Sequence, residues 1–203
     1  YKPRDQRSDQ SLEWAYGLMG TLQSGFTQGT VGVGVDAHLY YARQLDSGGG
    51  RAGKARLLGL DNEGHPKSDA SRGGAALKLR TSNTTLSYGE QRVKTPVFSS
   101  SDSRLLPETA TGFFLDSREV PDLRLVAGHF KESTDPNASS PARGFVVNYS
   151  NSKQGNSFDL AGAIYSGIAG LTASLYSSVY EDTWRQHYLG ASSVSYTHLT
   201  LPT

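Results

Sequence analysis

The side chains of this chain that could do chemistry are ionisable groups, and they do not form a recognisable catalytic or metal site. Asp36 and His38 stand two residues apart, a spacing that two metal ligands on one face of a strand can have, but no third ligand follows them. His129 and the serines and aspartates of the chain satisfy the count for a Ser-His-Asp triad, yet the nucleophile-elbow pattern Gly-x-Ser-x-Gly is absent. The sequence therefore predicts a protein that is not an enzyme and holds no metal.

Two basic side chains suit a different chemistry, the attraction of carboxylates. Lys78 and Arg124 each lie between two leucines, so in a β-strand the basic group and the leucines point to opposite faces. A guanidinium can bind a carboxylate through two parallel hydrogen bonds, which suits arginine to the selection of anionic solutes. The alternative is that these groups are only solvated, or are paired with acids such as Asp36 or Asp116.

Residues Thr30–Tyr41 indicate which elements must position these groups. They read T-V-G-V-G-V-D-A-H-L-Y-Y, so an unbroken apolar line alternates with small and ionisable residues. A period of two is typical of a strand and not of a helix. A strand of about 9–11 residues spans a bilayer when it is tilted, whereas strands of soluble proteins typically have about 5–6 residues. The segment favours a long strand with one wet face and one face on lipid or on a protein core.

The same alternation recurs along the chain, and no segment has a sustained helical period. We therefore predict an all-β chain of about eight full strands. The further strand segments are 14–22, 75–80, 84–88, 111–117, 123–128, 158–166 and 171–180.

The predicted connections alternate between short and long. Transmembrane β-barrels have this asymmetry, with tight periplasmic turns and long outer loops. Phe145–Tyr149 resembles a strand. Counting it as a strand of the barrel would put short turns on both sides of the membrane, so we assign it to a long outer loop. The short connections are 24–29, 81–83, 118–122 and 167–170, and the long ones are 46–70, 89–110 and 131–157.

Composition excludes several classes of protein. The 203 residues include no cysteine, which excludes structural disulfides and thiolate metal sites. No run of about 18 apolar residues is present, as a membrane-spanning helix would need. The net charge of +1 gives no reason to expect nucleic acid. Tyr1–Arg4 has neither the charged nor the apolar region of a signal peptide, so we expect the sequence to begin within a protein or after processing.

Four blocks of the sequence resemble the OprD family of substrate-specific outer-membrane porins. Weaker similarity links them, so the resemblance covers nearly everything before residue 194. The blocks are Q-S-G-F-T-Q-G-T-V-G-V-G-V-D-A at 23–37, S-R-L-L-P-E-T-A-T-G-F at 103–113, L-R-L-V-A-G-H-F at 123–130 and Y-E-D-T-W-R-Q-H-Y-L at 180–189.

The resemblance implies a monomeric, antiparallel transmembrane β-barrel of about eighteen strands in the Gram-negative outer membrane, surrounded by lipids and lipopolysaccharide. Residues 1–193 would supply the N-terminal half, from part of the first strand to about the ninth. A half barrel has unpaired edges that lipid does not tolerate, so the pore would belong to a longer parent protein. The implied function is facilitated diffusion of small carboxylate-bearing solutes, either amino acids or aromatic and cyclic carboxylates, without a cofactor or a nucleic-acid partner.

The last ten residues are predicted to lie outside this barrel. Residues 194–203 read V-S-Y-T-H-L-T-L-P-T, which breaks the preceding pattern and resembles the in-frame translation of a transposase sequencing adapter. We interpret 194–203 as an artefact of this kind. The alternative is a genuine tenth strand.

The resemblance also implies further pore-lining residues. Arg4 matches a basic-ladder position at the end of the first strand, and Arg7 follows it in a shortened loop. Arg104 lies in the block that resembles the third loop, which folds inward to narrow these pores. Tyr149 matches an aromatic residue at the narrowest zone. The complete predicted set is Arg104, Arg4, Arg7, Lys78, Arg124 and Tyr149.

An alternative from a different class is a soluble β-barrel or sandwich that binds ligands. The two hypotheses differ in where the apolar side chains lie, since a membrane barrel exposes them as a belt and a soluble protein packs them into a core. The aromatic residues Trp14, Tyr40, Tyr41 and Tyr88 are predicted to form interfacial girdles. An enzyme would need Ser and Asp side chains converging on His129. The residues expected in the belt are Val31, Val33, Val35, Leu77, Leu79, Leu123 and Leu125.

Overall fold

A computed structural model describes residues 14–45, 57–60, 67–139, 141–147 and 153–194. Nine strands form one antiparallel sheet in the order β1-β2-β3-β4-β5-β6-β10-β11-β12, and β1 and β12 do not pair within this part of the chain. The strands are β1 (Ala15–Gln23), β2 (Gly32–Gln44), β3 (Asp69–Thr81), β4 (Thr84–Gln91), β5 (Thr109–Ser117), β6 (Leu123–Thr134), β10 (Phe158–Ile168), β11 (Leu171–Tyr180) and β12 (Trp184–Ser193).

Three short strands lie off this path. β7 (Ala142–Arg143) pairs with β6, while β8 (Phe145–Val147) and β9 (Lys153–Gly155) pair with each other in a separate two-stranded sheet. Residues 145–147 therefore belong to the connection between β6 and β10, as the connection lengths predict. Among the described residues there is no helix, and hence none that could cross a membrane.

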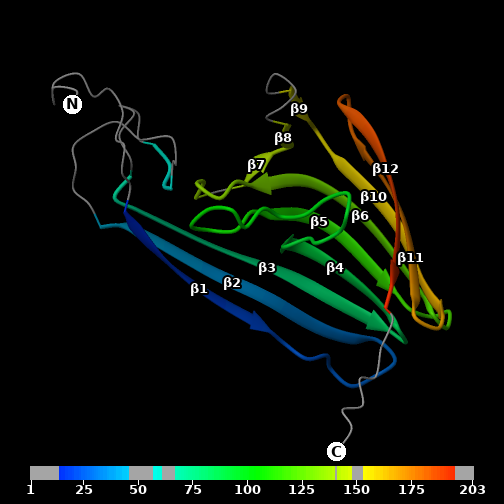
Figure 1. The fold of residues 1–203 in the computed structure, drawn as a ribbon. Helices are drawn as coiled ribbons and strands as arrows, with labels where there is room; N and C mark the ends of the chain where they lie inside the picture. Colours follow the sequence, from blue (N-terminus) through cyan, green and yellow to red (C-terminus); the bar gives the residue numbers. More distant parts are fainter. Residues whose placement is uncertain (1–13, 46–56, 61–66, 140, 148–152, 195–203) are drawn as a thin grey trace, which may run out of the picture.

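The sheet is strongly curved, and the connection between β4 and β5 lies on its concave side (Figure 1). We call the concave side the inner face and the convex side the outer face. The tight connections at 82–83, 118–122 and 169–170 gather at one end, which we call the short-turn end, and the long connections leave from the other, the long-loop end. The all-β class and the antiparallel arrangement that the sequence predicts are both confirmed.

The outer face carries the predicted apolar belt. Val31 is 52% exposed and Leu77 is 46% exposed, although both are apolar. A water-soluble fold would bury such a continuous line, whereas a barrel wall presents it to lipid. The soluble-core alternative is therefore wrong. Val31, Val33, Val35, Leu77, Leu79 and Leu125 are exposed, and Leu123 is half-buried.

Two expectations from the sequence need correction. The ninth strand of the sheet, β12, is additional to the eight predicted strands, because Arg185 and His187 interrupt the apolar line of its outward residues. Its connection to β11, residues 181–183, is a short turn at the long-loop end. Residues 195–203 lie outside the described part of the chain, so the predicted artefact is untested there.

The second correction concerns Tyr40, which is not part of a girdle. Tyr40 is only 1% exposed, because its position in the alternation places it on the inner face. There its ring stacks on His38 at a centroid distance of 4.7 Å. Trp14 and Tyr88, in contrast, are exposed large aromatics, as a girdle requires.

Candidate functional site

The connection between β4 and β5, residues 92–108, crosses the inner face of the sheet. At one side the ring of Phe98 packs 4.8 Å from that of Phe158, within a buried cluster on β5, β6, β10 and β11. At the other side Leu106 is buried with Tyr40 in a second cluster on β2 and β3. Because the segment is held at both ends, it narrows the space inside the curved sheet.

The first half of this segment is shaped by a local turn. The Thr95 N–H donates to Phe98 O at 2.8 Å, and the Ser100 N–H donates to Val93 O at 2.8 Å. Val93 and Val97 are buried while Lys94 is exposed, so the alternation of a short hairpin places the apolar side chains against the wall. The hydrophobic contacts of this turn hold the segment inward.

A buried arginine anchors the other end of the segment. Arg72, on β3, is 6% exposed, and its guanidinium donates to Asp135 O at 2.8 Å and to Pro107 O. Longer contacts reach Thr134 O at 3.4 Å and Ala138 O at 3.5 Å. A charge this far from water is tolerated when most of its donors are satisfied, and here Nε is the one guanidinium nitrogen without a hydrogen-bond partner among the described residues. Arg72 therefore fixes residues 92–108 to the start of the next long connection.

Glu90 provides the negative charge beside Arg72. Its carboxylate accepts hydrogen bonds from Thr109 Oγ1 and, at 3.4 Å, from Thr134 Oγ1. Oε1 of Glu90 also lies 3.4 Å from Nε2 of His38. Since these groups contact one another, the cluster holds the wall and the segment together and leaves few polar atoms for a solute. Neither Arg72 nor Glu90 was among the residues predicted from the sequence.

Arg104 lies in a small loop of residues 92–108, between Ser101 and Glu108, and its side chain is exposed. The Ser101 N–H donates to Glu108 Oε2 at 2.9 Å, and the Glu108 N–H donates to Ser101 O at 2.8 Å, which closes the loop between them. Burial raises the pKa of the Glu108 carboxyl, although the hydrogen bond from Ser101 opposes this. Nearby, Arg92 and Asp102 form an ion pair of 3.0 Å.

Lys78 and Arg124 lie on the inner face, but acids neutralise both. Lys78 pairs with Asp36 on the neighbouring strand. Arg124 binds both carboxylate oxygens of Asp116, with Nη2 2.6 Å from Oδ2 and Nε 3.0 Å from Oδ1. These are the acids that the sequence offered as alternative partners. The remaining predicted residues, Arg4, Arg7 and Tyr149, lie outside the described residues.

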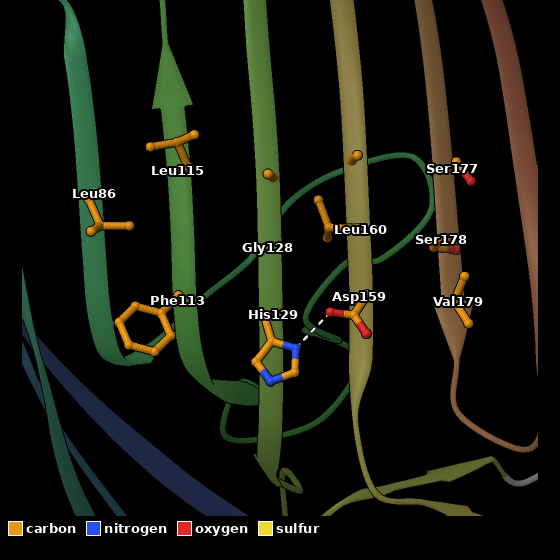
Figure 2. A pocket seen from close by; sticks show the side chains of 12 residues that line it. Leu86, Phe113, Leu115, Gly128, His129, Asp159, Leu160, Ser177, Ser178 and Val179 are labelled. Carbon is orange, nitrogen blue, oxygen red and sulfur yellow. Dashed lines mark hydrogen bonds and ion pairs between the residues drawn. The ribbon is translucent and has the colours of Figure 1, made fainter.

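One depression of the surface lies on the outer face, where side chains of β4, β5, β6, β10 and β11 line it (Figure 2). It has a volume of about 430 Å³, and Nδ1 of His129 lies 2.6 Å from Oδ1 of Asp159 at one end of it. The serines that line it on β11 make no hydrogen bond to His129 in the described part of the chain, so a Ser-His-Asp triad is not assembled. Further lining residues are Leu86, Phe113, Leu115, Ala127, Gly128, Leu160, Ala161, Ser177, Ser178 and Val179.

Metal binding has no support among the described residues either, where no group of three or more His, Asp and Glu side chains could hold an ion. What remains is a curved antiparallel sheet with a lipid-compatible outer face, an inner face rich in ion pairs, and a segment folded across it. These features define the wall of an outer-membrane β-barrel porin. A family profile described as "outer membrane porin, OprD family" matches residues 1–200. The chain belongs to the OprD family of outer membrane porins.

Individual relatives agree with this assignment. Porin D of Pseudomonas aeruginosa is 41% identical over 194 residues, which cover 95% of this chain and 43% of Porin D. The crystal structure of Pseudomonas aeruginosa OpdK with vanillate has a TM-score of 0.84 at 34% identity, covering 92% of this chain and 48% of OpdK. A BenF-like porin from Pseudomonas fluorescens Pf-5 has a TM-score of 0.85 at 30% identity, covering 92% of this chain and 48% of that porin. The chain thus spans somewhat less than half the length of these relatives.

These similarities confirm the predicted family and its location in the Gram-negative outer membrane, where membrane lipid surrounds the barrel. The relatives are porins, which are channels and not enzymes, in agreement with the prediction that the chain is not an enzyme.

Proposed function

We propose that this chain forms about half of a closed porin barrel that passes small carboxylate-bearing solutes by facilitated diffusion. Residues 1–193 would contribute the N-terminal half of the wall. A longer protein would close the barrel, and we call that protein the complete barrel. It would be a monomer whose outer face contacts lipid and lipopolysaccharide. Within the described residues the sheet is open at β1 and β12, and the chain spans less than half of Porin D, which together support a longer parent protein.

One observation carries the proposal: residues 92–108 cross the inner face and are fixed there by Arg72 and by two apolar clusters. Such a segment sets the aperture of a channel, so solutes would have to pass close to it. Arg104 lies on this segment and is exposed, which supports a contact between its guanidinium and the carboxylate of a passing solute. Guanidinium groups bind carboxylates with two hydrogen bonds and therefore select anionic groups.

The relatives support carboxylates as the class of solute. Vanillate, which is bound in the OpdK structure, is an aromatic carboxylate. We propose that aromatic or cyclic carboxylates, or amino acids, share the same guanidinium contacts in this barrel. Arg4, Arg7 and Tyr149 are proposed to extend the lining, while Lys78 and Arg124 would act mainly as halves of neutral ion pairs.

The test uses the complete barrel in planar bilayers, with benzoate as the charged probe and benzyl alcohol as its neutral counterpart. We expect benzoate to interrupt the single-channel current in a saturable way. Replacing Arg104 by Ala should weaken the apparent benzoate affinity about 5- to 10-fold, the loss of one charge-assisted contact of about 1–1.4 kcal/mol. Arg118→Ala, which removes an exposed arginine from the turn at 118–122, is the matched control. Equal benzoate binding by the original barrel and the Arg104→Ala variant would overturn the assigned role.

A further inference from the structure

The connection between β1 and β2 is an ordered segment that continues the pairing of these strands. The Ser24 N–H donates to Val35 O at 2.9 Å, and the Val35 N–H donates to Ser24 Oγ at 2.7 Å. Three residues further along, the Thr27 N–H donates to Val33 O and the Val33 N–H donates to Thr27 Oγ1, both at 2.9 Å. Because serine and threonine hydroxyls replace backbone partners here, residues between them are free to bulge toward the inner face.

Two glycines of β2 make room for that bulge. A Cβ atom on Gly34 would lie 2.7 Å from Gly25 O, and one on Gly32 would lie 3.0 Å from Phe26 Cβ. Larger residues at these positions would push the segment away from the sheet. Gly32 and Gly34 are therefore explained by the close approach of Gly25 and Phe26 to the inner face.

The Phe26 ring supports two basic side chains from β3. Arg80 Cζ lies 4.3 Å from the ring centroid and Lys78 Nζ lies 5.2 Å from it. The two cations differ in what else they contact. Lys78 is paired with Asp36 and donates to Ser24 O at 3.2 Å. Arg80 is exposed and has no carboxylate within ion-pair distance in the described part of the chain.

This arrangement has the chemistry of a binding site for an aromatic carboxylate. A guanidinium stacked on a ring keeps its N–H groups at its edge, where they can bind a carboxylate in the bidentate mode. The partly buried Phe26 offers an apolar surface beside the cation for the body of the ligand. Arg80 is the second-last residue of β3, so the site lies at the short-turn end and away from the anchored end of residues 92–108.

We propose that Arg80, stacked on Phe26, is a carboxylate-binding site at the short-turn end of the channel, with a preference for aromatic carboxylates. It would hold a solute between the narrow zone and the exit on that side. The inference rests on the proposed function, since it requires that carboxylates pass through the complete barrel.

The experiment measures current interruptions by benzoate added to the short-turn side of the complete barrel in a planar bilayer. We expect Arg80→Gln to lower the benzoate association constant on that side about 5- to 10-fold, while benzyl alcohol has no effect on either protein. Arg80→Lys should restore part of the affinity, because it returns the charge without the two-pronged geometry. Arg118→Gln is the control for loss of a positive charge at the same end.

A different result is expected if the contact between Arg80 and Phe26 only stabilises the fold and does not bind solutes. In that case Arg80→Gln would change the noise or the thermal stability of the channel but leave benzoate binding as it was, and the proposal would be overturned. Phe26→Leu gives a second test, since it keeps the charge and should reduce the preference for benzoate over acetate; an unchanged preference would count against the aromatic platform. If Arg104→Ala weakens benzoate binding while Arg80→Gln does not, only this inference fails. If the original barrel binds no benzoate from either side, the proposed function fails with it.

Discussion

Two arginines on the inner face of the same sheet have different roles. Arg72 is buried and its guanidinium is bonded to carbonyl groups of two separate connections. Arg124 is partly exposed and is bonded to a single carboxylate on the adjacent strand. A guanidinium that joins segments far apart in the sequence, as Arg72 does, fixes their positions on the inner face. One that pairs within the wall mainly cancels a charge.

Replacing Arg72 by Met should have the largest effect. Methionine fills much of the volume but leaves the carbonyls of Pro107 and Asp135 without their donor and Glu90 without a neighbouring cation. Loss of one partner from a buried charged cluster typically costs about 3–5 kcal/mol. We expect the complete barrel to unfold at lower temperature and to show a larger, noisier single-channel conductance, because residues 92–108 lose one of their attachments.

A matched variant shows whether position or charge is responsible. Arg124→Met removes the same side chain from the other site and should leave conductance noise and unfolding temperature close to the original. If Arg72→Met and Arg124→Met behave alike in both measurements, the distinction between the two arginines is wrong.

The second prediction concerns the pair of Arg124 and Asp116. Arg124→Gln leaves the Asp116 carboxylate with only its longer ion pair to Arg118, at 3.7 Å, and should shift ion selectivity toward cations. Arg124→Gln combined with Asp116→Asn should restore the original selectivity, since both charges are then absent. The coupling energy in stability should be about 0.2–1 kcal/mol, as for other exposed pairs. Reversal potentials in a salt gradient measure the first effect, and selectivity in the double variant that stays shifted would contradict it.

The smallest effect is expected at the short-turn end. The exposed Glu119 carboxylate accepts hydrogen bonds from Thr84 Oγ1, Ser82 Oγ and the Asn83 N–H, each at 2.9 Å. These bonds, that from Thr84 foremost, lower the pKa of Glu119. Their contribution is therefore complete above the ordinary glutamate pKa of about 4.3 and is lost as the pH falls through the lowered value.

Glu119→Gln should make the turn at 82–83 exchange its amide hydrogens faster at neutral pH. The difference from the original protein should disappear at a pH below the lowered pKa, where both side chains are uncharged. Hydrogen exchange followed by mass spectrometry on the complete barrel measures it. Exchange rates that are the same at neutral pH would show that the carboxylate does not hold the turn.

The sequence predicted the wall of this protein well and its interior less well. Strands such as β2 could be located because lipid on one side and water on the other impose a period of two. β12 was missed because its outward residues include Arg185 and His187, which interrupt the apolar line. The same alternation correctly predicted that Lys78 and Arg124 lie on the inner face.

The alternation of residues along a strand does not show which charged side chains pair with one another. The ion pairs and the contacts of Arg72 could therefore not be predicted from the sequence. Arg72 appears in the sequence as one more basic residue on a strand, because its partners are carbonyl groups 35 or more positions away. The pairing of Lys78 with Asp36 follows from the register of two neighbouring strands, which the sequence leaves open. The roles of Arg104, Arg4, Arg7 and Tyr149 remain predictions.

A cross-link can test whether residues 92–108 lie across the inner face while the channel conducts. A Cβ atom on Gly17 would lie 3.2 Å from both Leu105 Cγ and Leu105 O, so the two positions are in direct contact, as a disulfide requires. The chain has no cysteine of its own, so Gly17→Cys and Leu105→Cys can be introduced together. Leu39→Cys on the outer face, combined with Leu105→Cys, is the control that should not cross-link.

We predict that the Gly17→Cys, Leu105→Cys disulfide forms in the complete barrel within the outer membrane, and that single-channel conductance is the same before and after reduction. That result would mean that the segment already occupies this position while the channel conducts. A pair that does not cross-link, or a cross-link whose formation lowers the conductance, would show that residues 92–108 lie elsewhere in the conducting channel.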